Sequence, residues 1–138
     1  MDLAVDRADL PRISAAVRSL GLEYRHVAGV DMLVDAKTPK ARSGIRLLFA
    51  GEKVRSSDLA AVPGFSEPVV TSESILVISA ADLVRMKLTS FRQRDKTHII
   101  DMDSVGLITP EIEAALPEPL RDRLQQVRAQ EAQSTGAE

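Results

Sequence analysis

The chain has 138 residues with a formal net charge of -2, and 44% of its residues are apolar. This is the composition of an ordinary soluble domain, and the small net charge gives no bulk attraction to nucleic acid or to an anionic membrane. The absence of cysteine excludes disulfides and thiolate metal sites, and no apolar stretch approaches the roughly 18 residues that span a bilayer.

The N-terminal part predicts a strand, a helix and a hairpin. It opens with an early acid and no basic segment, so we expect no signal peptide and a cytoplasmic location. The apolar run Leu3–Val5 predicts a short strand. Helical spacing of apolar residues predicts a helix over about residues 8 to 20, and Gly21 stands where a helix commonly ends. Residues 23–27 and 30–34 predict two strands joined by a tight turn.

The middle of the chain predicts loops and short strands. Residues 37–43 are polar and basic and predict a loop, and residues 45–50 predict a compact apolar strand. Proline and glycine make residues 56–68 irregular. Two short strand candidates follow, at residues 69–70 and 75–78.

The last third predicts four helices. Ser79 is a credible N-cap for a helix to about Arg92, and a second helix is expected from residue 95 to about 105. Proline in a first turn predicts a short helix after Thr109 and a last helix from residue 119 to about 129. The remaining residues, 130–138, are small and polar, so we expect a disordered tail.

This order of elements predicts an α+β fold, with a small mixed or antiparallel sheet and a helical C-terminal third. No internal repeat and no interdomain linker is evident in the sequence. We therefore expect a single domain over residues 1–129.

The residues alone suggest one phosphate-binding cluster. Lys87 and Arg92 are suited to phosphate contacts, and Asp95 follows Arg92 at a spacing of three. The alternative is an exposed helix face, on which Arg92 and Asp95 form an ion pair of a few tenths of a kcal/mol.

Other candidates remain open between a site and ordinary structure. Asp95, His98 and Asp101 spread over about 120° of a helix. The three residues could form a metal site, or His98 could form an ion pair with Asp101. Tyr24 and His26 share one strand face, as a binding pocket or as a packed tyrosine with an edge histidine. The basic residues between 37 and 55 could contact RNA phosphates or form a solvated loop and strand edge.

The chain resembles the minimal nucleotidyltransferase-fold family, which includes the nucleotidyltransferases of abortive-infection toxin–antitoxin systems. The resemblance is carried by the pattern K-L-x-x-x-R-x-R-D-x-x-x-x-x-D from Lys87 to Asp101. An uncharacterised branch of that family is similar in three further segments, which are Gly21–Val30, Phe49–Arg55 and Val84–Arg92. The similarity covers roughly residues 2 to 125 and implies a truncated nucleotidyltransferase-like domain.

The resemblance also implies a site. In the family, a Gly-rich turn holds phosphates, an Asp-x-Asp strand and a later strand acid bind metal, and a helical Lys and Asp assist nucleotide binding and chemistry. Asp2 matches the second metal acid, and Lys87 and Asp95 match the helical pair, so these three are the implied catalytic residues. Lys87 and Arg92 are the implied nucleotide-binding residues. The implied cofactors of an active enzyme are Mg²⁺ and a nucleoside triphosphate.

Part of this implied site has no counterpart in the sequence. The Gly-rich turn and the first metal acid are missing, and Arg46 stands near the place of the later strand acid. A guanidinium group has donors only and cannot ligate Mg²⁺. Asp2 alone would leave most of the ligands of a magnesium ion to water.

Two functions follow as hypotheses. In the first, the chain is catalytically incomplete and acts as a binding or interaction module. In the second, it is an active metal-dependent nucleotidyltransferase of toxin–antitoxin type that transfers a nucleoside monophosphate to RNA or protein. A homodimer through exposed sheet edges or C-terminal helices is a further hypothesis, as is a protein partner. Nucleic acid and membrane are not expected as partners.

Overall fold

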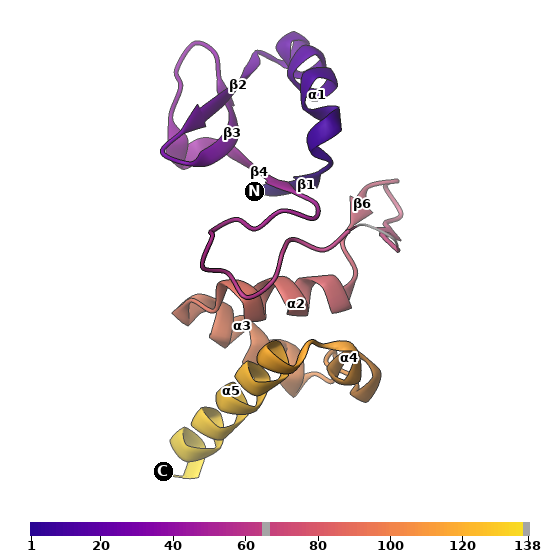
Figure 1. Ribbon diagram of the computed structural model, residues 1–138. Coiled ribbons are helices and arrows are strands. Elements are labelled where there is room, and N and C mark those ends of the chain that lie inside the picture. Colours follow the sequence, from indigo (N-terminus) through magenta and orange to yellow (C-terminus); the bar gives the residue numbers. More distant parts are fainter. Residues whose placement is uncertain (65–66, 137–138) are drawn as a thin grey trace. The chain divides into compact units, whose positions relative to one another are not determined.

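The computed structural model describes residues 1–64 and 67–136. These form two compact units, Met1–Ser56 and Ser57–Glu138, whereas the sequence predicts a single domain over residues 1–129. Residues 65–66, within the stretch expected to be irregular, and 137–138, at the end of the expected tail, lie outside the described residues. The expected α+β fold is confirmed, because a four-stranded mixed sheet precedes a helical C-terminal portion (Figure 1).

The first unit is a mixed sheet with one helix. In chain order it contains β1 (Asp2–Val5), a short 3-10 turn at Arg7–Asp9, α1 (Leu10–Val17), a second turn at Arg18–Leu20, β2 (Leu22–Val27), β3 (Val30–Asp35), a third turn at Ala41–Ser43 and β4 (Ile45–Phe49). The strand order is β1-β4-β3-β2, with β1 parallel to β4 and the other pairs antiparallel. All four strands lie where the sequence predicts them. Because one pair is parallel and two are antiparallel, the mixed alternative for the sheet is the correct one.

Helix α1 covers one face of this sheet. Its apolar residues recur at helical spacing and pack against Leu33 and Phe49, which are buried. Pro11 lies in the first turn, where its missing N–H costs nothing. Gly21 ends the second 3-10 turn with φ 73, in the left-handed region that favours glycine. These local signals explain why the predicted helix and its end are correct.

The second unit is a hairpin followed by four helices. Its elements are β5 (Val69–Val70), β6 (Leu76–Val77), α2 (Ala80–Ser90), α3 (Gln93–Ser104), α4 (Pro110–Ala115) and α5 (Glu118–Gly136). The predicted N-cap Ser79 is present, since the backbone N–H of Asp82 donates to its hydroxyl at 3.1 Å, and Thr109 caps α4 in the same way, with the backbone N–H of Ile112 donating to its hydroxyl at 3.3 Å. Such caps satisfy donors that a helix start leaves unpaired.

The core of this unit joins α2, α3 and α5. Val84 and Leu88 of α2, Ile99 of α3 and Leu120 and Leu124 of α5 are each at most 1% exposed. In α2 and in α5 the named residues lie four positions apart, so each of these two helices buries one continuous apolar face. The predicted helical spacing therefore reports the core of this unit correctly.

Helix α5 corrects the expected disordered tail. The helix continues to Gly136 instead of ending near Ala129. Alanine, glutamine and glutamate after position 129 favour helix, and the hydroxyls of Ser134 and Thr135 donate to carbonyl oxygens one turn earlier. Although α5 is long, neither it nor any other helix in residues 1–64 and 67–136 is long and apolar enough to cross a membrane.

We expect Leu124→Ala to lower the free energy of unfolding by about 2–5 kcal/mol, because it leaves a cavity at a fully buried position. Urea unfolding followed by far-UV circular dichroism measures the loss. The control Leu107→Ala removes a leucine that is 48% exposed, and it should change the stability by no more than about 0.5 kcal/mol. Equal losses in the two variants would contradict the assigned core.

Candidate functional site

Asp2, the implied metal ligand, is paired with Arg46. Strands β1 and β4 run parallel with Asp2 directly opposite Arg46. A terminal nitrogen of the Arg46 guanidinium donates to Asp2 Oδ2 at 2.6 Å. The arginine therefore not only fails as a metal ligand but also occupies the carboxylate that the resemblance assigns to the metal. A cation at Asp2 has to compete with this guanidinium.

Asp95 lies at the junction of α2 and α3 and is 1% exposed. Its Oδ2 atom accepts hydrogen bonds from the Ser90 hydroxyl at 2.7 Å, from the Arg92 backbone N–H at 3.1 Å and from Arg92 Nε at 2.9 Å. Its Oδ1 atom accepts one from Lys87 Nζ at 3.1 Å. The structure thus brings together Lys87, Arg92 and Asp95 in the second unit, while Asp2 belongs to the first.

These contacts determine the charge of Asp95. Burial by itself raises the pKa of this carboxyl, but hydrogen bonds from Ser90, Arg92 and Lys87 outweigh burial and hold the pKa well below its usual range. The carboxylate stays ionised at neutral pH and is neutralised by two cations. It is an internal hydrogen-bond acceptor with both oxygens occupied.

The exposed-face alternative is wrong for Asp95. It assumed that Arg92 and Asp95 form a solvated pair, but the side chain of Asp95 is completely buried. The reason is the turn at Phe91, where the backbone reverses and lays α3 against α2, so that Asp95 meets the end of the preceding helix. The sequence analysis did not anticipate Ser90, because its contact with Asp95 depends on the geometry of this turn.

A second cationic contact closes the end of α2. Arg123 of α5 donates from one nitrogen to the carbonyl oxygens of Leu88 and Thr89, at 2.7 and 2.8 Å. These carbonyls belong to the last turn of α2, which has no helical partners for them. The Phe91 ring lies against two cations, Lys96 Nζ and the Arg123 guanidinium, each 4.6 Å from the ring centroid. Nothing local to the α2–α3 sequence signals Arg123.

The possible metal trio on α3 does not assemble. Asp95 is buried and occupied by its own contacts, whereas His98 and Asp101 are exposed. The alternative His98–Asp101 ion pair is also not formed among residues 1–64 and 67–136. Within the same residues, no group of three or more histidine, cysteine or acidic side chains is placed to hold a metal ion.

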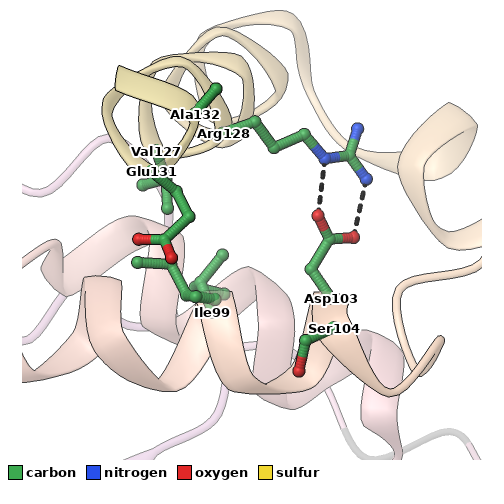
Figure 2. A pocket seen from close by; sticks show the side chains of 8 residues that line it. Ile99, Asp103, Ser104, Val127, Arg128, Glu131 and Ala132 are labelled. Atoms are coloured by element: carbon green, nitrogen blue, oxygen red, sulfur yellow. Dashed lines mark hydrogen bonds and ion pairs between the residues drawn. The ribbon is translucent and has the colours of Figure 1, made fainter. Parts of the chain in front are cut away.

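A groove of about 330 Å³ lies between α3 and α5, and Figure 2 shows the side chains that line it. Its lining residues are Ile99, Ile100, Asp103, Ser104, Val127, Arg128, Glu131 and Ala132. The apolar residues come from both helices. One side is fixed by Asp103, whose two oxygens each accept a hydrogen bond from Arg128 at 2.8 Å.

The ion pair beside the groove is part of a larger set of hydrogen bonds. Arg128 also donates to Glu113 Oε2 at 2.7 Å, so one guanidinium joins α3, α4 and α5. Its hydrogen bonds lower the pKa of Asp103, although burial opposes the shift. The sequence analysis did not anticipate the groove, because Arg128 lies 25 residues from Asp103 and the pairing depends on how the helices pack.

Comparison of the sequence with family models and curated proteins, and of the structure with solved structures, found no match. The resemblance to nucleotidyltransferases therefore stays a hypothesis, and the functional argument depends on this chain's own geometry.

Replacing Asp95 with Asn should lower the free energy of unfolding at pH 7 by about 2–4 kcal/mol, because two cations and a hydroxyl lose a buried acceptor. The pKa of Asp95 is depressed in the folded state, so its contribution is present above the unfolded-state pKa of about 3.9 and is lost as the pH falls below it. Wild-type stability should therefore fall more steeply below that pH than the stability of the variant.

Urea titrations at several pH values measure this difference. The matched control Asp101→Asn removes an exposed carboxylate of the same helix and should change the stability by no more than about 0.5 kcal/mol. If Asp95→Asn is as stable as this control at pH 7, Asp95 is not the structural acceptor described here.

Proposed function

We propose that this chain is a binding or interaction module rather than a catalyst, and that the residues matching a nucleotidyltransferase stabilise its structure instead. The observation that supports this most is the complete engagement of Asp95, which is buried with both oxygens accepting hydrogen bonds. The pairing of Asp2 with Arg46 supports it further. A cytoplasmic location belongs to the same proposal.

The groove between α3 and α5 is the binding surface of this proposal. Residues 57–138 contain eight Lys and Arg against thirteen Asp and Glu, a formal net charge of -5. Complementarity therefore favours a basic partner, and the apolar residues of the groove favour a segment with one apolar face. We propose that the occupant is a basic amphipathic helix of a protein partner.

A homodimer is part of the same proposal as an alternative assembly. Strand β1 stands at one end of the order β1-β4-β3-β2, so its outer backbone groups have no strand partner in the part of the chain that the structure describes. Such an edge can pair with the same edge of a second copy. Light scattering of the free protein distinguishes a dimer from a monomer that awaits a different partner.

The alternative function is an active metal-dependent nucleotidyltransferase of toxin–antitoxin type. One observation favours it: Lys87 and Asp95, the two helical residues that the resemblance implies, are in direct contact at 3.1 Å. In this alternative, Asp2 is the metal ligand, Lys87 and Arg92 contact the triphosphate, and Mg²⁺ and a nucleoside triphosphate are the cofactors. For Asp2 to bind a metal ion, its carboxylate has to release the Arg46 guanidinium.

Isothermal calorimetry separates the two functions. We expect no binding of Mg²⁺ with nucleoside triphosphates to the wild-type chain, because both implied acids are occupied by internal cations. The variant Arg46→Asp places two carboxylates opposite each other on adjacent strands and should gain Mg²⁺ affinity. Micromolar binding of a nucleotide by the wild type would overturn the module proposal and favour the alternative.

NMR titration tests the groove. A synthetic amphipathic helix of leucine and lysine should shift the methyl signals of Ile100 and Ala132, which line the groove and are not buried, whereas a leucine–glutamate helix should not, because the unit is acidic. Ala132→Arg narrows the groove at an exposed position and should weaken binding about tenfold, or about 1.4 kcal/mol.

The matched control is Gln130→Arg, which adds the same charge to α5 at an exposed position outside the groove lining. It should leave the affinity nearly unchanged. Equal weakening by both variants, or equal binding of both peptides, would show that the groove is not the binding surface.

A further inference from the structure

A histidine, an aspartate and a tyrosine meet on the sheet of the first unit. Alternation along β2 places Tyr24 and His26 on one face, as the sequence predicts, and the β2–β3 register sets His26 opposite Asp31. His26 Nδ1 lies 2.8 Å from Asp31 Oδ1, and the Tyr24 hydroxyl donates to the same oxygen at 2.5 Å. Asp31 is the member of this group that the sequence analysis missed.

Burial gives the three residues different roles. Tyr24 packs against the core cluster of the sheet, as the packed alternative predicts. The side chain of Asp31 is 12% exposed, whereas that of His26 is 58% exposed. Asp31 is therefore the buried anchor of the group, and His26 reaches water.

The carboxylate selects one form of the imidazole ring. Because Asp31 is an acceptor, His26 Nδ1 carries the proton that joins them, and the lone pair of the neutral ring is left on Nε2. An exposed imidazole with a fixed tautomer is a suitable nucleophile.

The surroundings keep Asp31 ionised. Burial raises the pKa of Asp31, but the hydrogen bonds from Tyr24 and His26 and the positive charge of Arg7 outweigh it and lower the pKa. Arg7 is itself held by two hydrogen bonds to Glu52, at 2.6 and 2.9 Å, and its guanidinium lies 3.9 Å from the centroid of the Phe49 ring. The negative charge of Asp31, which orients His26, is therefore stabilised by Tyr24 and by an arginine that is itself held in place by Glu52.

The charge of the unit indicates which electrophile it attracts. Residues 1–56 contain ten Lys and Arg against seven Asp and Glu, a formal net charge of +3. This field favours anionic reagents over neutral ones. Acyl phosphates are anionic electrophiles that transfer a phosphoryl group to imidazole.

We propose that His26 is a phosphoryl-acceptor site that takes its phosphoryl group on Nε2 from small acyl phosphates. The Nε2 lone pair forms a bond to phosphorus, the bond between phosphorus and the acyl oxygen breaks, and the carboxylate leaves with that electron pair. The ring keeps its proton on Nδ1 and becomes an imidazolium, whose positive charge Asp31 stabilises. Asp31 is a positioning residue, since it acts through the ring.

The chain contains its own control. It has two histidines, and the other one, His98, is exposed on α3 with no ion pair to an acid among the described residues. Incubation with acetyl phosphate, followed by ³¹P NMR and peptide mass spectrometry, measures phosphorylation at both positions in one sample. We expect His26 to react at least about tenfold faster than His98, because within residues 1–64 and 67–136 His26 has a carboxylate partner and His98 has none.

Two variants separate activation from folding. Asp31→Asn should lower the rate at His26 to that at His98, and long-range ¹⁵N NMR should show loss of the single Nδ1–H tautomer. Tyr24→Phe removes one hydrogen bond to Asp31 but leaves the His26 contact, so the rate should change little. Equal rates at the two histidines of the wild type would overturn the proposal whatever the variants do, and so would an unchanged rate in folded Asp31→Asn.

Discussion

The carboxylate of Asp95 is the contact on which the arrangement of the second unit depends most. It lies at the start of α3, and it accepts hydrogen bonds from Lys87 and Ser90 of α2 and from Arg92 in the turn between the two helices. A buried charge is costly unless it is paired and hydrogen-bonded, and here both conditions are met. In the observed geometry of the turn, both oxygens of the carboxylate therefore accept hydrogen bonds.

Helix α5 stabilises the same junction from outside. Arg123 occupies the carbonyl oxygens that end α2, and its guanidinium lies against the ring of Phe91. Phe91 itself has φ 50, an unfavourable conformation for a residue with a Cβ atom. The contacts of its ring with two cations offset part of that cost. The segment that contains Lys87, Arg92 and Asp95 is therefore held in place by contacts within the α2–α3 turn and by contacts from α5.

The two units differ in the chemistry that they offer. The first carries a net positive charge and a histidine whose outer nitrogen reaches water. The second carries a net negative charge and a groove with apolar residues on two helices. Opposite charges favour different partners, so the two proposed ligands, an anionic small molecule and a basic protein segment, are assigned to different units. This division also explains why the net charge of the whole chain, -2, is uninformative.

Most of the helices and strands could be predicted without the structure, although not the end of α5, since helical spacing, caps such as Ser79 and the end at Gly21 are local signals that act within a few residues. The sequence also indicated that Lys87, Arg92 and Asp95 belong together, but it did not reveal that Asp95 is buried. The burial of Asp95 follows from the tertiary structure. The same is true of three ion pairs, which join Asp31 to His26, Arg46 to Asp2 and Arg128 to Asp103. These contacts join strands or helices whose register and packing arise when apolar faces are buried together, so no local pattern reports them.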